Sequence, residues 1–112
     1  MALEFPNILI AACLVDANGG AFLRSKGFVG LVANGPGDFT LTLKEEMNGD
    51  AAIILATLQE TPPGSVNGCI TTIRPAQPDN LHIRVVTSTV PQGANKNMKF
   101  ALAVFQLSAD AQ

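Results

Sequence analysis

The chain has 112 residues, 47% of them hydrophobic and only 14% charged, and its formal net charge is −2. This length fits one domain, and the composition is the opposite of the polar, highly charged signature of disordered chains. The longest apolar runs, residues 8–15 and 51–58, are far shorter than the roughly 20 residues that span a bilayer, and the seven Lys and Arg form no basic stripe for nucleic acid. We therefore expect neither a membrane nor nucleic acid as a partner.

The start of the chain superficially resembles a lipoprotein leader, because residues 8–13 read Ile-Leu-Ile-Ala-Ala-Cys. A secretory segment needs a positively charged region followed by about 7–15 apolar residues. Here the first charged residue is Glu4, a Pro-Asn pair interrupts, and the apolar stretch before Cys13 is too short. We expect no signal peptide, a buried strand over residues 8–15 and a core thiol at Cys13.

The rest of the chain consists of short β-rich runs bounded by Gly, Pro, Asn and Asp, with no long stretch of helical period. The predicted strands are residues 8–15, 21–24, 27–32, 39–43, 51–58, 66–74, 81–87 and 98–107. A jelly roll is the economical architecture for about eight antiparallel strands in two sheets, although a closed barrel gives nearly the same pattern. The sequence predicts an all-β, eight-stranded antiparallel jelly-roll sandwich over residues 8–107, with an N-terminal arm (1–7) and a short tail (108–112).

Two segments alternate clearly between apolar and polar residues. In residues 39–43, Phe, Leu and Leu alternate with two Thr, which predicts an apolar inner face and a Thr-bearing outer face. In residues 81–87, Leu, Ile and Val alternate with His82 and Arg84, so both polar side chains are expected to point outward. His82 titrates near neutrality and is a conceivable receptor or pH-sensitive contact, but we favour an ordinary surface histidine.

Two other strands, residues 51–58 and 98–107, are apolar on both faces. A short helix is an alternative for the first, but its Ile53-Ile54 pair and flanking turn residues favour a strand. Because an antiparallel strand with one wet face should alternate, we expect the outer faces of both strands to pack against another copy of the chain. The residues expected at this oligomer interface are Ile53, Leu55, Phe100, Leu102 and Phe105.

The order of turns and strands has a family-like layout. It comprises the turn at residues 16–20, the Gly-Phe-Val-Gly strand at 27–30, the turn and strand at 35–43, and the closing strand at 100–105. This layout resembles the trimeric jelly-roll heads of tumour-necrosis-factor-like and complement-like domains and of phage and bacterial fibre or decoration proteins. The resemblance implies a homotrimer that packs through apolar sheet faces, located on a virion surface and bound to a capsid or tail protein.

Candidate chemistry is sparse along the chain. Two Cys and one His are too few for a typical metal site, and we expect both thiols to be free, because small disulfide scaffolds are richer in Cys. Glu45, Glu46 and Asp50 suggest a charged turn, since Ca²⁺ takes about 6–8 oxygen ligands. No nucleophile, base and orienting group can be named together. We expect no enzyme activity, no catalytic or metal-binding residues and no cofactor.

The remaining candidates are contacts with partners. An unpaired N-terminal arm can add to a neighbour's sheet edge, so we expect Leu3, Phe5 and Pro6 to dock the protein on an assembly. The alternative function is a small carbohydrate- or receptor-binding module that uses the polar loops at 61–66 and 91–97, with a host surface glycan as its ligand. The loop residues expected to contact such a partner are Gln92, Asn95, Lys96 and Asn97.

Overall fold

The prediction of an all-β sandwich is confirmed by a computed structural model, which describes residues 8–16, 20–47, 52–59, 67–73, 80–90 and 93–106. Within these ranges the chain forms eight strands and no helix. The strands are β1 (Ile8–Asp16), β2 (Ala21–Lys26), β3 (Phe28–Gly35), β4 (Asp38–Leu43), β5 (Ala52–Leu58), β6 (Asn67–Ile73), β7 (His82–Val90) and β8 (Phe100–Gln106). The described part of the chain accordingly has no helix of the length and apolarity that crossing a membrane requires.

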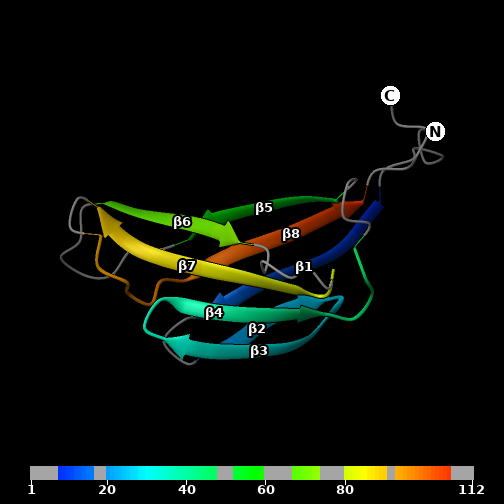
Figure 1. The fold of residues 1–112 in the computed structure, drawn as a ribbon, viewed down its shortest axis with the longest axis horizontal. Coiled ribbons are helices and arrows are strands. Elements are labelled where there is room, and N and C mark those ends of the chain that lie inside the picture. Colours follow the sequence, from blue (N-terminus) through cyan, green and yellow to red (C-terminus); the bar gives the residue numbers. More distant parts are fainter. Residues whose placement is uncertain are drawn as a thin grey trace.

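The strands form two four-stranded antiparallel sheets that overlie each other (Figure 1). Sheet A has the order β2-β1-β8-β5 and sheet B the order β3-β4-β7-β6. The pairs β1–β2, β3–β4 and β6–β7 join consecutive strands, whereas β1–β8, β5–β8 and β4–β7 join distant ones. Three of the six strand pairs therefore join strands that are consecutive in the sequence, and three join strands that are not.

The core lies between the two sheets and follows from the alternation of side chains along each strand. Phe39 of β4 and Phe100 of β8 are fully buried and face each other across the sandwich, with ring centroids 5.8 Å apart. The inward positions predicted for residues 39–43 and 81–87 are confirmed, because the apolar residues of both segments join this core. The register of β3 against β4 shifts between Phe28 and Gly30, which marks a bulge in β3 at this point.

The segment at 93–97, predicted as a polar loop, lies along the end of β7. Strand β7 extends beyond β4, and this segment supplies partners to the part of β7 that β4 does not reach. Thr89 N donates to the carbonyl of Ala94 at 2.9 Å, and Lys96 N donates to the carbonyl of Thr87 at 3.1 Å. The segment thus satisfies backbone groups that burial would otherwise leave unpaired.

Gly37, in the β3–β4 turn, holds this segment in place. Its backbone is left-handed, with φ of 64°, and it is buried. Its N–H donates to Oδ1 of Asn97 at 2.7 Å, and its carbonyl accepts from the N–H of Thr87 at 2.8 Å. A Cβ at this position would lie 2.5 Å from the Thr87 carbonyl and 2.6 Å from the N of Lys96. Only glycine provides both the backbone conformation and the space.

We expect Gly37→Ala to lower the free energy of unfolding by more than the ~1–2 kcal/mol that a left-handed backbone alone costs an L-residue, because the new Cβ also meets backbone atoms. Urea denaturation measures this loss. Two glycines serve as controls. Gly20→Ala has the left-handed φ but open space and should lose only the conformational cost, whereas Gly35→Ala has neither constraint and should stay within ~0.5 kcal/mol. Equal losses at all three positions would contradict this account.

Candidate functional site

The outer face of sheet A is apolar across three strands, β1, β8 and β5. Alternation points one set of side chains from each strand away from the core, and in this sheet nearly all of them are hydrophobic. We call these residues the apolar face: Leu9, Ala12, Leu14, Ile53, Leu55, Ala101, Ala103 and Phe105. An antiparallel sheet with one solvated face usually places polar residues there, so this face has the composition of a contact surface.

The strand register arranges the apolar face in cross-strand rows. Ile53 lies beside Phe105, which lies beside Leu9, and in the next row Leu55 lies beside Ala103, which lies beside Ala12. The alanines of the central strands leave a shallow, almost entirely apolar hollow of about 240 Å³ beside Leu55. The exposed fraction of 55% for Leu55 shows that the rim of this hollow is open. The apolar face therefore offers a partner an open depression lined by mostly apolar side chains.

The prediction that Phe100 and Leu102 lie at the interface is wrong. Phe100 and Leu102 are 0% and 2% exposed and belong to the core between the sheets. Because side chains alternate along a strand, the outward residues of β8 are Ala101, Ala103 and Phe105. Ile53, Leu55 and Phe105 do lie on the outer face, as predicted. The run at 8–15 is apolar on both faces too, and this pattern is the signal that could have added the outward residues of β1.

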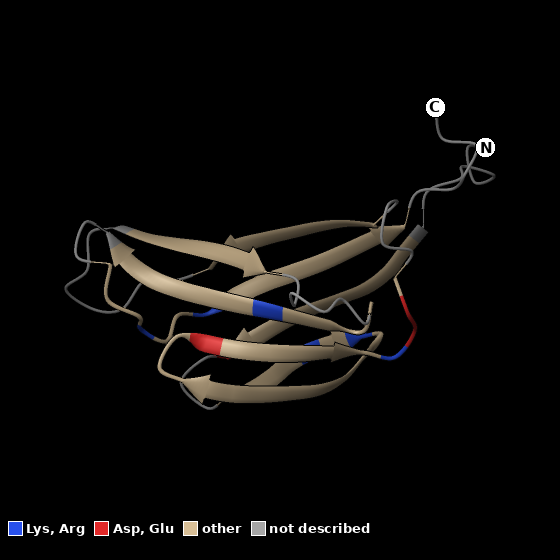
Figure 2. Cartoon of the chain, in the orientation of Figure 1, with Lys and Arg blue, Asp and Glu red and all other residues tan. Residues whose placement is uncertain are grey.

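Among the described residues, the charged residues of sheet A are Asp16 at the end of β1 and Arg24 and Lys26 on β2. Arg24 and Lys26 of β2 lie beside Leu14 and Ala12, and line a second hollow of about 320 Å³. Strands β5 and β8 contain no Lys, Arg, Asp or Glu, and both ribbons are tan, without blue or red, in Figure 2. The apolar face is thus bounded by cations at its β2 edge and is uncharged at its β5 edge.

The outer face of sheet B differs in chemistry. Its outward residues include Thr40, Thr42, Arg84 and Asp38, from the two central strands. The Arg84 guanidinium donates to both carboxylate oxygens of Asp38, at 2.9 and 2.6 Å, and the side-chain amide of Asn34 donates to Asp38 Oδ1 at 3.2 Å and to Thr40 Oγ1 at 2.8 Å. These polar groups pair with one another on an open surface, which suits contact with solvent.

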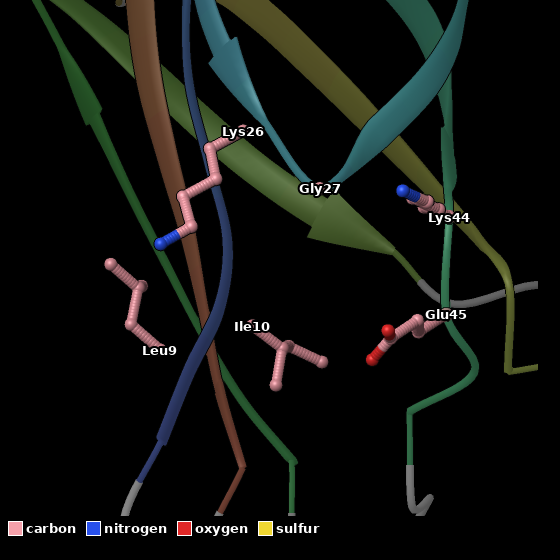
Figure 3. Close-up of a pocket in the computed structure, with 6 residues that line it drawn as sticks. All are labelled: Leu9, Ile10, Lys26, Gly27, Lys44 and Glu45. Carbon is pink, nitrogen blue, oxygen red and sulfur yellow. The ribbon is translucent and has the colours of Figure 1, made fainter.

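Another hollow, of about 320 Å³, lies at one end of the sandwich (Figure 3). Leu9 and Lys26 lie on one side of it, Lys44 and Glu45 on the other, and Ile10 between them. The chain passes from β2 to β3 at Gly27, which lies between Lys26 and Lys44 in this view. Its lining combines aliphatic side chains with charges of both signs, and it adjoins the apolar face at Leu9.

The structure describes only some of the residues predicted to dock the protein or to contact a partner through a loop. Leu3, Phe5, Pro6 and Gln92 lie outside the described residues, as do the loop at 61–66 and Asp50. Asn95 and Lys96 are exposed, so their side chains are accessible to a partner. Asn97 is half-buried and accepts the hydrogen bond from Gly37, which gives it a structural role.

His82 and Arg84 point outward from β7, as predicted. His82 lies beside Thr42 on the outer face of sheet B and is half-buried. Among the residues that the structure describes, no three His, Cys, Asp or Glu side chains gather into a group that could hold a metal ion.

Both cysteines are free, as predicted. Cys13 is 7% exposed in the core, and burial raises the pKa of its thiol to about 12. Cys69 is exposed on β6, with its sulfur 3.0 Å from the hydroxyl oxygen of Ser88 on the outer face of sheet B. The two thiols therefore differ in their access to solvent.

Comparison of the chain with known protein families, curated proteins and solved structures finds no match.

We expect one thiol per native chain to react with a disulfide reagent at neutral pH and two to react in denaturant. The thiolate is the nucleophile, and the buried, weakly acidic Cys13 supplies almost none. Spectrophotometric thiol titration measures the count. In Cys69→Ser the fast reaction of the native protein should vanish, while one thiol should still react after unfolding. A fast native reaction that persists in Cys69→Ser would contradict the burial of Cys13.

The Asp38–Arg84 pair gives a prediction for pH. Hydrogen bonds from the Arg84 guanidinium lower the pKa of the Asp38 carboxyl below its ordinary value. A group whose pKa is lowered by folding stabilises the fold above its unfolded pKa of about 3.9, and this stabilisation is lost as pH falls through the folded pKa. NMR titration of Asp38 should therefore show a low pKa that rises toward the ordinary value in Arg84→Gln, with no change in the control Lys96→Gln. An unchanged pKa in Arg84→Gln would contradict the pairing.

Proposed function

We propose that the protein is a non-enzymatic structural protein that assembles with copies of itself through the apolar face and forms part of the surface of a phage particle. The observation that carries this proposal is the apolar face, where eight outward positions on three adjacent strands are hydrophobic. Water contact with such a face is unfavourable, and each Å² of apolar surface removed from water contributes roughly 25 cal/mol.

Self-association is the partner choice that the two outer faces favour together. Monomeric soluble proteins rarely expose contiguous apolar patches larger than a few hundred Å², whereas homo-oligomers cover such patches by closed symmetry. The Thr-bearing outer face of sheet B, with the Arg84–Asp38 pair, is suited to remain in solvent. One face of the sandwich is thus directed to other copies and the other to the surroundings.

The number of copies and the location are proposed from the resemblance to trimeric jelly-roll heads. In such an arrangement three apolar faces meet around a three-fold axis, and the polar faces point outward. The proposed partner beyond the trimer is a capsid or tail protein, and the location is the virion surface as a decoration or fibre-head protein.

We expect Ala103→Lys to break the contact through the apolar face and so to lower the mass of the native oligomer, because it places a charge in the middle of that face. Light scattering at several concentrations, with and without reductant, measures the mass. The matched control Val32→Lys introduces the same charge at an exposed position of sheet B and should leave the mass unchanged. Circular dichroism confirms that both variants fold.

A wild-type chain that stays monomeric over the whole concentration range would contradict the proposal, as would an Ala103→Lys variant with the mass of the wild type. In the monomeric case the carbohydrate-binding alternative takes precedence, and glycan-array binding through Asn95 and Lys96 is the measurement to make. Electron microscopy of particles carrying the labelled protein tests the virion location separately.

A further inference from the structure

Within the described residues, β5 is an edge strand of sheet A that pairs with β8 on one side only. Strand β6 of sheet B packs against β5 but forms no hydrogen-bonded pair with it, so one edge of the β5 backbone is unpaired. The opposite edge strand, β2, carries Arg24 and Lys26 and has a register irregularity where it pairs with β1. Charges and bulges are the devices that protect sheet edges from pairing with other chains. Strand β5 has no charged residue and no register shift.

The edges of sheet B also differ from β5. Strand β3 has two register irregularities against β4, so its edge is bent. Strand β6 is regular but polar, with Thr71 and Thr72 in its centre. In β5 the only polar side chain is that of Thr57. Of the four edges, that of β5 is therefore the one that combines regular geometry with an apolar sequence.

One backbone hydrogen bond determines which backbone groups of β5 face this edge. Gln59 N donates to the carbonyl of Lys99 at 2.7 Å, one position beyond Leu58, which pairs with Phe100 in the ladder. In an antiparallel pair, hydrogen-bonded and non-hydrogen-bonded positions alternate. Residues 53, 55 and 57 therefore direct their backbone groups toward β8. The backbone N–H and carbonyl groups that point to the free edge belong to Ala52, Ile54, Ala56 and Leu58.

We propose that the free edge of β5 pairs with β5 of a second copy, antiparallel and about a two-fold axis at Leu55. This register pairs all four residues whose backbone groups point to the free edge: Ala52 pairs with Leu58, and Ile54 pairs with Ala56. By symmetry each pair occurs twice. Each inward pair matches a large side chain with a small one, and on the outer face Leu55 meets Leu55 of the second copy. Sheet A thereby becomes one eight-stranded sheet whose apolar face is continuous across both copies.

This pairing rests on the proposal that the protein assembles from copies of itself, and it adds a contact separate from the apolar face. A two-fold contact cannot relate the subunits within a three-fold ring, because cyclic trimers use head-to-tail contacts. The β5 pairing therefore joins copies that belong to different trimers, and six copies form the closed assembly. The chemistry of the contact is the backbone ladder itself, as in other strand additions.

The test is cross-linking in a Cys69→Ser background, with Leu55→Cys as the diagnostic variant. Residues that oppose each other at non-hydrogen-bonded positions have Cα atoms about 4.5 Å apart, within the range for a disulfide. Under mild oxidation we expect Leu55→Cys to form disulfide-linked dimers. Ile53→Cys should not do so alone, but it should cross-link when mixed with Thr57→Cys, which it opposes in this register. Val32→Cys, exposed on sheet B, gives the background yield.

Adding Ala56→Pro to Leu55→Cys removes an N–H that points to the free edge and leaves the hydrogen bonds to β8, so it should reduce cross-linking to the background. A Leu55→Cys yield no higher than that of Val32→Cys overturns the proposal, as does cross-linking that survives Ala56→Pro. If the wild type is trimeric but Leu55→Cys does not cross-link, the edge pairing fails and the proposed function stands. If the cross-link forms but Ala103→Lys leaves the mass unchanged, the apolar-face contact fails and the edge pairing stands.

Discussion

The packing of two sheets against each other through a single layer of alternating side chains is the constraint on which the rest of the structure depends. Once Phe39 and Phe100 meet in that layer, the side-chain direction at every other residue of β4 and β8 is determined. The same register places Ala101, Ala103 and Phe105 outside and aligns them with the outward residues of β1 and β5. The apolar face is therefore a consequence of how the core is filled.

The strands and the inward residues of alternating segments could be predicted from the sequence because they depend on local pattern alone. Residues 39–43 and 81–87 show this, since each alternates in a way that only one sheet orientation satisfies. For strands that are apolar on both faces, the direction of each side chain could not be predicted, because hydrophobicity does not distinguish the inner face from the outer face. For this reason the expected interface includes Phe100 and Leu102, which the structure places in the core.

Features that depend on pairing between distant segments could not be predicted from local pattern. The position of residues 93–97 along β7 depends on Gly37 and Asn97, which are 60 positions apart in the sequence. The rows of the apolar face likewise require the pairing of β1 with β8, from opposite ends of the chain. Nothing in the composition of either segment specifies its partner.

The place of β8 within sheet A has a consequence for folding. Strand β8 lies between β1 and β5, so β5 has no partner in sheet A, and β1 has only β2, until residues 100–106 have been synthesised. Folds dominated by such non-local pairings form slowly, because loop closure comes before the stabilising contacts. During this delay both edges of the apolar β5 are open to other nascent chains, and the yield of soluble protein will depend on synthesis rate and temperature.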